Sequence, residues 1–185
     1  MAAFLYRLSG QDDVVVGLPA AGQPLVGREP LVGHCVHLLP LRSRVDGADR
    51  SADYLRAFRN RLSDAYQHHQ YTFGTLVSKL RLHRDPARIP LLSVMFNGDR
   101  ELQDLRFDGL RVDYCWNPRR FENFELYLNA VECDKQLRLE CTYNSDLFDA
   151  DTIRRRMQEF EVFLQGIVAA PAETIEKLPI RPPAE

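Results

Sequence analysis

Histidine side chains offer most of the chemistry that this sequence could carry out, and their spacing decides which chemistry is open to them. His68 and His69 are adjacent, and an imidazole can hold or move a proton near neutral pH. His34 and His37 are three residues apart. On a strand that odd spacing would turn them to opposite faces, so they could not bind one metal ion. The sequence therefore offers a possible acid–base pair and no histidine metal site.

The cysteines form no recognisable metal or redox motif. The four of them stand at positions 35, 115, 133 and 141. None belongs to a Cys-x-x-Cys pair, so neither a zinc knuckle nor a redox dithiol is expected. Their even number leaves disulfides open, but no secretion signal supports an oxidising compartment. We expect buried free thiols, no bound metal and a cytoplasmic location.

The composition and the motifs that the sequence lacks exclude several broad classes of protein. The chain has 185 residues with 24 basic and 26 acidic side chains, a net charge of -2, so the basic excess of a nucleic-acid-binding protein is absent. No apolar run approaches the ~18 residues of a membrane span. There is also no Gly-x-Ser-x-Gly elbow, P-loop, His-Glu-x-x-His or dinucleotide-binding glycine pattern. The length suits one globular domain.

Apolar periodicity predicts an α/β domain in which helices cover a mixed sheet. Period-two alternation and continuous apolar runs predict strands over residues 14–16, 35–39, 91–96, 110–116, 124–130 and 137–143, the last two as a hairpin. Helical spacing predicts helices ending at Gly10 and spanning about 51–68, 72–80 and 149–168. Three prolines and two glycines predict a long loop over 18–30. Pro40 indicates an edge strand or bulge, and the segment after Lys177 is expected to be a linker.

Five segments follow one another in an order that is typical of one enzyme family. They are Leu8–Gly17, Val32–Arg42 (Val-Gly-His-Cys-Val-His-Leu-Leu-Pro-Leu-Arg), His69–Phe73, Arg84–Leu91 (Arg-Asp-Pro-Ala-Arg-Ile-Pro-Leu) and Tyr143–Asp149 (Tyr-Asn-Ser-Asp-Leu-Phe-Asp). On these segments the chain resembles the C-terminal half of the condensation domains of nonribosomal peptide synthetases, from about residue 5 to Ile180. The resemblance implies one lobe of a two-lobed domain with a chloramphenicol-acetyltransferase-like fold.

The histidine pair nearly reproduces the catalytic motif of that family without occupying its place. His68 to Gly74 is similar to His-His-x-x-x-Asp-Gly, but Phe73 stands where the aspartate belongs. A phenyl ring can neither accept an N–H bond nor pair with a cation. The pair also follows the Pro40 motif, whereas the family's catalytic histidines belong to the N-terminal half. We therefore expect no catalytic residue in this chain.

The resemblance also implies a reaction and a set of partners. Condensation domains join a carrier-bound acyl or peptidyl thioester to a carrier-bound aminoacyl amine, forming an amide. Residues 1–180 would form the C-terminal lobe, and residues 181–185 would begin a linker. The implied partners are the N-terminal lobe of the same domain, the upstream and downstream carrier proteins and an adjoining adenylation domain, with no nucleic acid or membrane. No cofactor would be bound directly, because the carriers deliver the phosphopantetheine arms.

Family motifs assign expected roles to particular positions. The resemblance implies a tunnel wall at His34, Val36, His37, Tyr71 and Phe73, a floor loop at Leu18, Pro19, Ala20 and Gly22, a latch at Trp116 and Phe121, and a structural motif at Arg84, Asp85 and Arg88. His37-Leu38 replaces the family's usual Asn-Thr. Phe121–Asn129 looks similar to condensation domains at polyketide-to-peptide junctions.

Two alternatives stay open from the sequence. The chain could be part of a degenerate condensation-like domain that recruits a carrier or tailoring protein without catalysis. It could also be an unrelated α/β domain. An intact His-His-x-x-x-Asp-Gly motif upstream would favour the enzyme over the platform.

Overall fold

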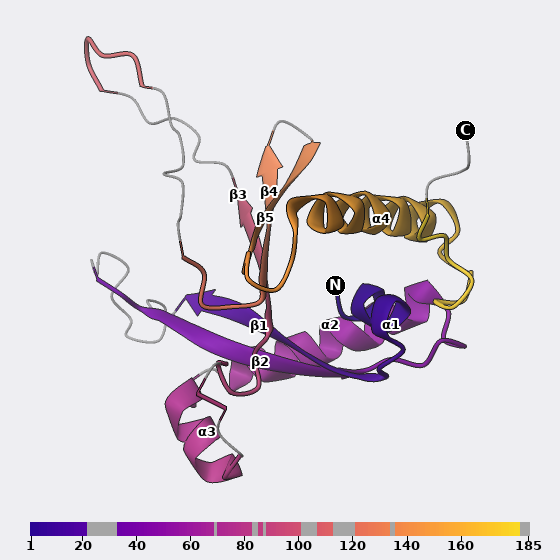
Figure 1. The fold of residues 1–185 in the computed structure, drawn as a ribbon, viewed down its shortest axis with the longest axis horizontal. Helices are drawn as coiled ribbons and strands as arrows, with labels where there is room; N and C mark the ends of the chain where they lie inside the picture. Colours follow the sequence, from indigo (N-terminus) through magenta and orange to yellow (C-terminus); the bar gives the residue numbers. More distant parts are fainter. Residues whose placement is uncertain are drawn as a thin grey trace.

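The computed structural model describes residues 1–21, 33–68, 70–82, 85–86, 88–100, 107–112, 121–133 and 136–181. Runs of helices and runs of strands follow one another along these residues, as Figure 1 shows. In chain order they are α1 (Ala2–Ser9), β1 (Asp13–Ala21), β2 (Val36–Arg44), α2 (Ser51–Gln67), α3 (Phe73–Leu80), β3 (Val94–Arg100), β4 (Leu126–Cys133), β5 (Gln136–Tyr143) and α4 (Ala150–Ala169). The predicted α/β class is confirmed.

The strands form one mixed sheet with the order β2-β1-β3-β4-β5. β1 pairs antiparallel with β2 and parallel with β3, β3 pairs parallel with β4, and β4 and β5 form the predicted hairpin. β3 occupies the predicted central position but begins at Val94, because Leu91 has a positive φ of 67° that interrupts an extended chain. Pro40 lies on the edge strand β2, as expected, although β2 continues past it to Arg44.

Three helix ends follow their sequence signals. Gly10 ends α1 with a φ of 72°, a conformation that glycine adopts without strain. The side chains of Thr72 and Asp149 accept hydrogen bonds from the backbone N–H groups of Thr75 and Thr152, which caps α3 and α4. Local capping chemistry therefore fixes where these helices begin and end.

The main core lies between the sheet and helices α1, α2 and α4. Phe4 of α1 contacts both Phe160 and Phe163 of α4, with ring centroids 5.0 and 5.8 Å apart. These rings pack with Leu128 of β4, which is fully buried. A cavity of about 190 Å³ remains between the three helices and the sheet, lined by apolar side chains that include Phe163 and Phe96.

The segment after α4 is bound to the domain, which corrects the expectation of a linker after Lys177. Ile175 and Leu178 are each 1% exposed and belong to the core. Arg7 Nη1 donates hydrogen bonds of 2.7 Å to the carbonyl oxygens of both residues. Ser51 N–H donates to the Glu173 carbonyl, at 2.9 Å. We call residues 171–180 the C-terminal strap; residues 182–185 lie outside the described part of the chain.

The sheet divides where β1 and β3 meet. These strands pair only at Val16 with Val94 and at Gly17 with Met95. Beyond that point β1 continues with β2 alone while β3 continues with β4, and Figure 1 shows the two pairs of strands diverging. A Cβ atom on Gly17 would lie 2.1 Å from Met95 Sδ and 3.1 Å from Leu92 Cδ1. Glycine therefore allows the close approach at the point of division.

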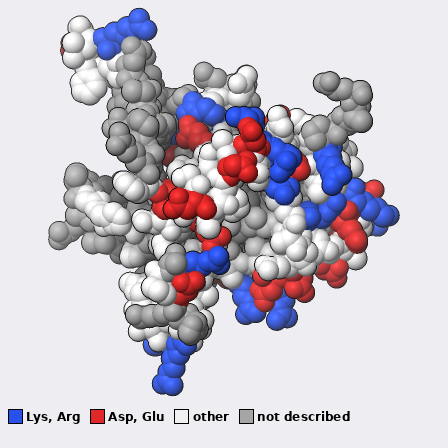
Figure 2. Space-filling view, in the orientation of Figure 1, with Lys and Arg blue, Asp and Glu red and all other residues white. Residues whose placement is uncertain are grey.

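Charged side chains of both signs lie interspersed on the face of the molecule in Figure 2. Close pairs such as Arg138–Glu140 at 2.9 Å and Arg156–Glu159 at 2.6 Å bring opposite charges together. Among the described helices, none is long and apolar enough to span a membrane.

Candidate functional site

The distal half of the β1–β2 hairpin carries several of the positions that the family motifs mark. We call residues 18–21 of β1 and residues 36–39 of β2 the β1–β2 arm; its pairs include Pro19 with Leu38 and Ala20 with His37. The predicted loop over 18–30 is therefore wrong in its first four residues, which are strand. A proline is tolerated at Pro19 because β1 has only one partner strand there. Gly22 lies outside the described residues.

Strand alternation separates the predicted tunnel-wall residues of the arm. Val36 and His37 are consecutive in β2, so their side chains point to opposite faces of the sheet. His37 shares the face of its partner Ala20, and Val36 shares the face of Ala21. Val36 is 46% exposed, and His34 is an exposed residue that precedes the strand. The two β2 residues cannot both line one wall.

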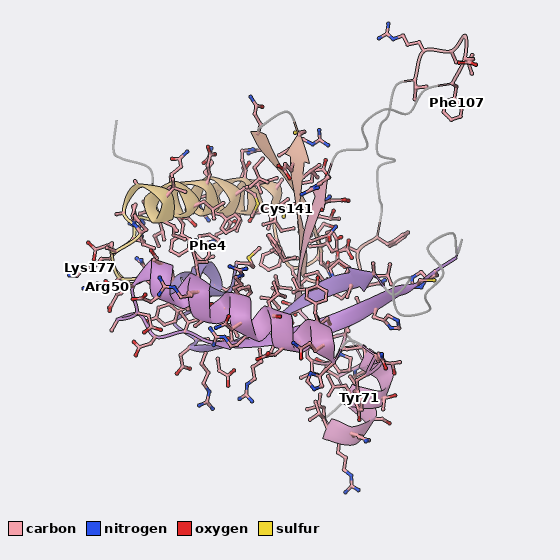
Figure 3. The ribbon with its side chains drawn as sticks, turned by 180° about the vertical axis from the view of Figure 1, so that it is seen from behind. Phe4, Arg50, Tyr71, Phe107, Cys141 and Lys177 are labelled. Atoms are coloured by element: carbon pink, nitrogen blue, oxygen red, sulfur yellow. The ribbon has the colours of Figure 1, made fainter. Side chains whose placement is uncertain are left out.

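The other two predicted wall residues come from the start of α3. Tyr71 is partly exposed beside this helix, as Figure 3 shows, and the Lys79 ammonium lies 5.2 Å from its ring centroid. Phe73 is the first residue of α3 and is half-buried. α3 contacts β2, so these aromatic rings belong to an element next to the arm rather than to the arm itself. His69 is among the residues that the structure does not describe.

Latch positions are only partly covered by the structure. Phe121 is 91% exposed just before β4, and Trp116 lies outside the described residues. The strand predicted over 110–116 is absent in its described part, residues 110–112. There a bridge joins Phe107 to Leu110 around Gly109, whose φ is 75°. Figure 3 shows Phe107 far from the sheet, and residues 110–112 have no partner strand among the residues that the structure describes.

The Arg-Asp motif contacts the start of β4. Arg88 Nε lies 3.9 Å from an Asp85 carboxylate oxygen and 3.4 Å from Glu125 Oε1. The same Glu125 oxygen accepts a 3.0 Å hydrogen bond from the Ser93 hydroxyl. These contacts join the segment before β3 to the segment before β4. Arg84 lies outside the described residues.

A row of polar side chains crosses three strands on the face of the sheet that carries Met95 and Gly17. We call Asn97, Asn129, Glu140 and Arg138 the polar ladder. Asn97 Nδ2 donates to Asn129 Oδ1 at 3.1 Å, Asn129 Nδ2 donates to Glu140 Oε2 at 3.2 Å, and Arg138 Nε donates to Glu140 Oε1 at 2.9 Å. The sequence pattern did not indicate this row, although an asparagine within the apolar run of β4 was a usable signal.

The opposite face of β5 holds a thiol whose ionisation is suppressed. Burial raises the pKa of Cys141 from the usual 9.0 to about 11. In the part of the chain that the structure describes, Cys35, Cys133 and Cys141 are free thiols, and no group of three or more His, Cys, Asp or Glu side chains could hold a metal ion.

Cys141 is therefore expected to resist alkylation in the folded protein. Iodoacetamide at about pH 8 should modify Cys141 at least tenfold more slowly in native buffer than in urea, because the reagent attacks the thiolate. Mass spectrometry of the Cys141 peptide measures the alkylation rate in buffer and the alkylation rate in urea. Since the thiolate forms more easily in the unfolded chain, Cys141 should also lower folding stability as the pH rises from 9.0 towards about 11. Equal rates in buffer and urea would show that the thiol is not buried.

The described residues thus form a mixed five-stranded sheet with a core packed against α1, α2 and α4, and its β1–β2 pair diverges from β3 and β4. The family model "Condensation domain" matches residues 1–185. The chain belongs to the condensation domain family.

The curated relatives include synthases of plipastatin and of gramicidin S. The chain is 37% identical over 173 residues to a plipastatin synthase polypeptide of Bacillus subtilis (strain 168), covering 90% of this chain and 7% of that protein. It is 33% identical over 180 residues to gramicidin S synthase 2 of Brevibacillus brevis, covering 96% of this chain and 4% of that protein. The chain thus spans a small part of the length of the curated relatives it matches.

Solved structures share the fold at lower identity. A four-domain nonribosomal peptide synthetase bound to AMP and glycine superposes with a TM-score of 0.84 at 20% identity, covering 98% of this chain and 15% of that one. The X-domain in complex with OxyB from teicoplanin biosynthesis gives 0.83 at 21% identity, covering 99% and 41%. The starter condensation domain of rhizomide synthetase gives 0.74 at 21% identity, covering 98% and 43%. The predicted chloramphenicol-acetyltransferase-like fold is confirmed.

Proposed function

We propose that residues 1–180 form the C-terminal lobe of a condensation domain that joins a carrier-bound acyl or peptidyl thioester to a carrier-bound aminoacyl amine. The observation that carries this proposal is the extent of the structural match. Almost all of this chain aligns with 43% of the rhizomide starter condensation domain. A match of nearly one half is what a single lobe of a two-lobed domain would give.

The lobe contributes a wall to the tunnel between the two lobes rather than a catalytic base. The β1–β2 arm supports this role because it diverges from the rest of the sheet. On the face of Val36 it carries neutral, mostly apolar side chains, among them Pro19, Ala21 and Leu38. Such a surface suits an uncharged, extended pantetheine arm and excludes water from the thioester. We assign the wall to this face, which leaves His37 on the opposite one.

Floor loop and latch complete the proposed lobe. The segment after Ala21 would form the floor of the tunnel, and the segment leading to Phe121 would begin the latch towards the N-terminal lobe. The exposed ring of Phe121 gives such a latch an apolar contact to bury. The partners in this proposal are the N-terminal lobe, both carrier proteins and an adenylation domain, and the phosphopantetheine arm arrives as part of the substrate.

Orientation is the chemistry that such a lobe supplies. Holding the thioester carbonyl and the amine in a near-attack arrangement can supply several kcal/mol of barrier lowering. A proton-accepting group on the N-terminal lobe would complete the site.

The similarity of Phe121–Asn129 to domains at polyketide-to-peptide junctions makes a polyketide-derived donor our preferred subtype.

The platform alternative has the same fold. The X-domain complex with OxyB shows that a condensation-like fold can bind another protein. Because that likeness shows the fold alone, an activity measurement has to separate the two functions.

The isolated chain is expected to form no amide from loaded donor and acceptor carriers, whereas the synthetase that contains it should. The chain lacks the catalytic motif, and His69 is not expected to replace it. His69→Ala in the synthetase should therefore leave the rate of amide formation within about twofold of wild type, compared with the loss of 10²–10⁴ that removing a general base causes. Product above a heat-killed control with the isolated chain, or a large loss in His69→Ala, would contradict the proposal. A synthetase that forms no amide would favour the platform.

A further inference from the structure

The polar ladder has a fixed hydrogen-bond direction, and this direction determines what its free end offers. An ionised carboxylate accepts hydrogen bonds only, so the Asn129 group facing Glu140 must be its NH₂. That leaves Asn129 Oδ1 facing Asn97, and Asn97 must turn its own NH₂ towards it. Arg138 holds the carboxylate from the far side, at 2.9 Å. The remaining atom at the end of the ladder is Asn97 Oδ1, an acceptor.

Asn97 stands at the boundary between the core and the open part of this face. Two residues before it, Met95 is buried against Gly17, and two residues after it, Asp99 is exposed. Asn129 is 7% exposed, so the middle of the ladder is closed to solvent, whereas Asn97 is half-buried. Within the part of the chain that the structure describes, the Asn97 side chain makes no hydrogen bond besides the one to Asn129. Its Oδ1 is available to a ligand.

The position of this acceptor relates it to the β1–β2 arm. Parallel pairing places Gly17 and Met95 side by side, so Asn97 lies on the face that Ala21 and Val36 share. Asn97 follows directly on the point where β1 leaves β3. An extended ligand on this face would therefore meet apolar arm residues on one strand pair. On the other pair it would meet Asn97 first, with the exposed carboxylate of Asp99 two residues further along β3.

We propose that Asn97 Oδ1 accepts a hydrogen bond from an amide N–H of the phosphopantetheine arm, and that Glu140 acts as a positioning residue by fixing the ladder's direction. This inference rests on the proposed function. An uncharged acceptor with one free oxygen matches a neutral amide donor, whereas a cation would favour a carboxylate. The ladder selects amide over ester, because an ester oxygen has no proton to donate and would face Asn97 Oδ1 with its own lone pairs.

The test compares arms that differ by one atom. The acceptor carrier protein is loaded with an aminoacyl-phosphopantetheine arm, or with analogues in which either amide N–H is replaced by an ester oxygen. Amide formation is then measured in the synthetase that contains this chain. Wild type should show a KM about three- to tenfold higher for one of the two ester analogues, the effect of one neutral hydrogen bond. Asn97→Ala should raise the KM of the natural arm to that level and remove the preference.

Two further variants separate positioning from general damage. Glu140→Gln permits the Asn129 side-chain amide to adopt either orientation, so the variant should show a reduced preference for the amide arm over the ester analogue. Its melting temperature should lie within a few degrees of wild type. Asn60→Ala, an exposed asparagine on α2, is the matched control and should retain the full preference. A variant that merely destabilised the lobe would slow amide formation equally with the natural pantetheine arm and with both ester analogues. The proposal would be overturned if wild type had the same KM for the natural arm and for both ester analogues, or if Asn97→Ala kept the wild-type preference. Amide formation in those experiments would still support the proposed function. Absence of amide formation in wild type would overturn both the proposal and the proposed function.

Discussion

Replacing Phe163 with alanine is expected to lower the free energy of unfolding by about 3–5 kcal/mol, the range observed when large aromatic side chains are removed from cores. Phe163 is 1% exposed and contacts Phe4 with a centroid distance of 5.8 Å. It also lines the cavity of about 190 Å³. Because that space is already incompletely filled, truncation would enlarge the cavity, and the surrounding helices would have few side chains able to close it.

Urea unfolding followed by circular dichroism measures this loss. Val168→Ala is the control on the same helix: Val168 is 82% exposed, and its truncation should change stability by less than about 0.5 kcal/mol. The unfolding slope should be unchanged in both variants, since neither alters the surface exposed on unfolding appreciably. Similar midpoints for the two variants would mean that α4 does not pack on the sheet through Phe163.

Leu178→Ala is expected to cost about 2–5 kcal/mol, although the residue lies in a segment whose composition resembles a linker. Its side chain is 1% exposed in the same core as Phe163. A Cβ on Gly166 of α4 would lie 2.8 Å from Pro179 Cδ, which shows how closely the C-terminal strap approaches that helix. Removing the leucine would therefore leave a void between the strap, α1 and α4.

Lys177→Ala is the matched control, one residue earlier and exposed. It should unfold within about 0.5 kcal/mol of wild type. Proteolysis adds a second readout: native cleavage within the strap should be faster in Leu178→Ala than in Lys177→Ala, because local opening becomes easier. If both variants matched wild type, the strap would be a linker after all.

Those elements that depend on local signals were predictable from the sequence. Capping by Thr72 and Asp149, the glycine end of α1 and the β4–β5 hairpin all rest on residues close together in the chain. Periodicity alone predicts a mixed α/β class, and the family motifs predict the particular fold within that class.

Elements that depend on distant partners were not predictable in the same way. Residues 18–21 are strand because β2 pairs with them, and their proline content indicated the opposite. Leu178 is buried because Arg7 and α4 hold the strap, which no local pattern records. Residues 110–112 alternate in sequence yet lack a partner strand among the residues that the structure describes. Long-range pairing decided each case.

The candidate site shows the same limit. The motifs marked Val36 and His37 together, and only the strand register turns them to opposite faces. The polar ladder was invisible because its members come from three strands, and their hydrogen bonds depend on the register of two strand pairs. Burial of Asn129 is a tertiary property that a single asparagine in the sequence does not reveal.

The most direct test of a tunnel wall in this lobe is a single plugging variant, Val36→Trp, made in the synthetase that contains this chain. Val36 is partly exposed, so an indole can be accommodated without entering the core. On the proposed wall it would displace the pantetheine arm, and misplacement by about 1 Å can cost up to about 10²-fold in rate. Amide formation should fall at least about tenfold while amino-acid loading of the carriers stays unchanged. Val168→Trp, on the exposed side of α4, should leave both rates at wild type. Wild-type amide formation by a folded Val36→Trp synthetase would contradict the account.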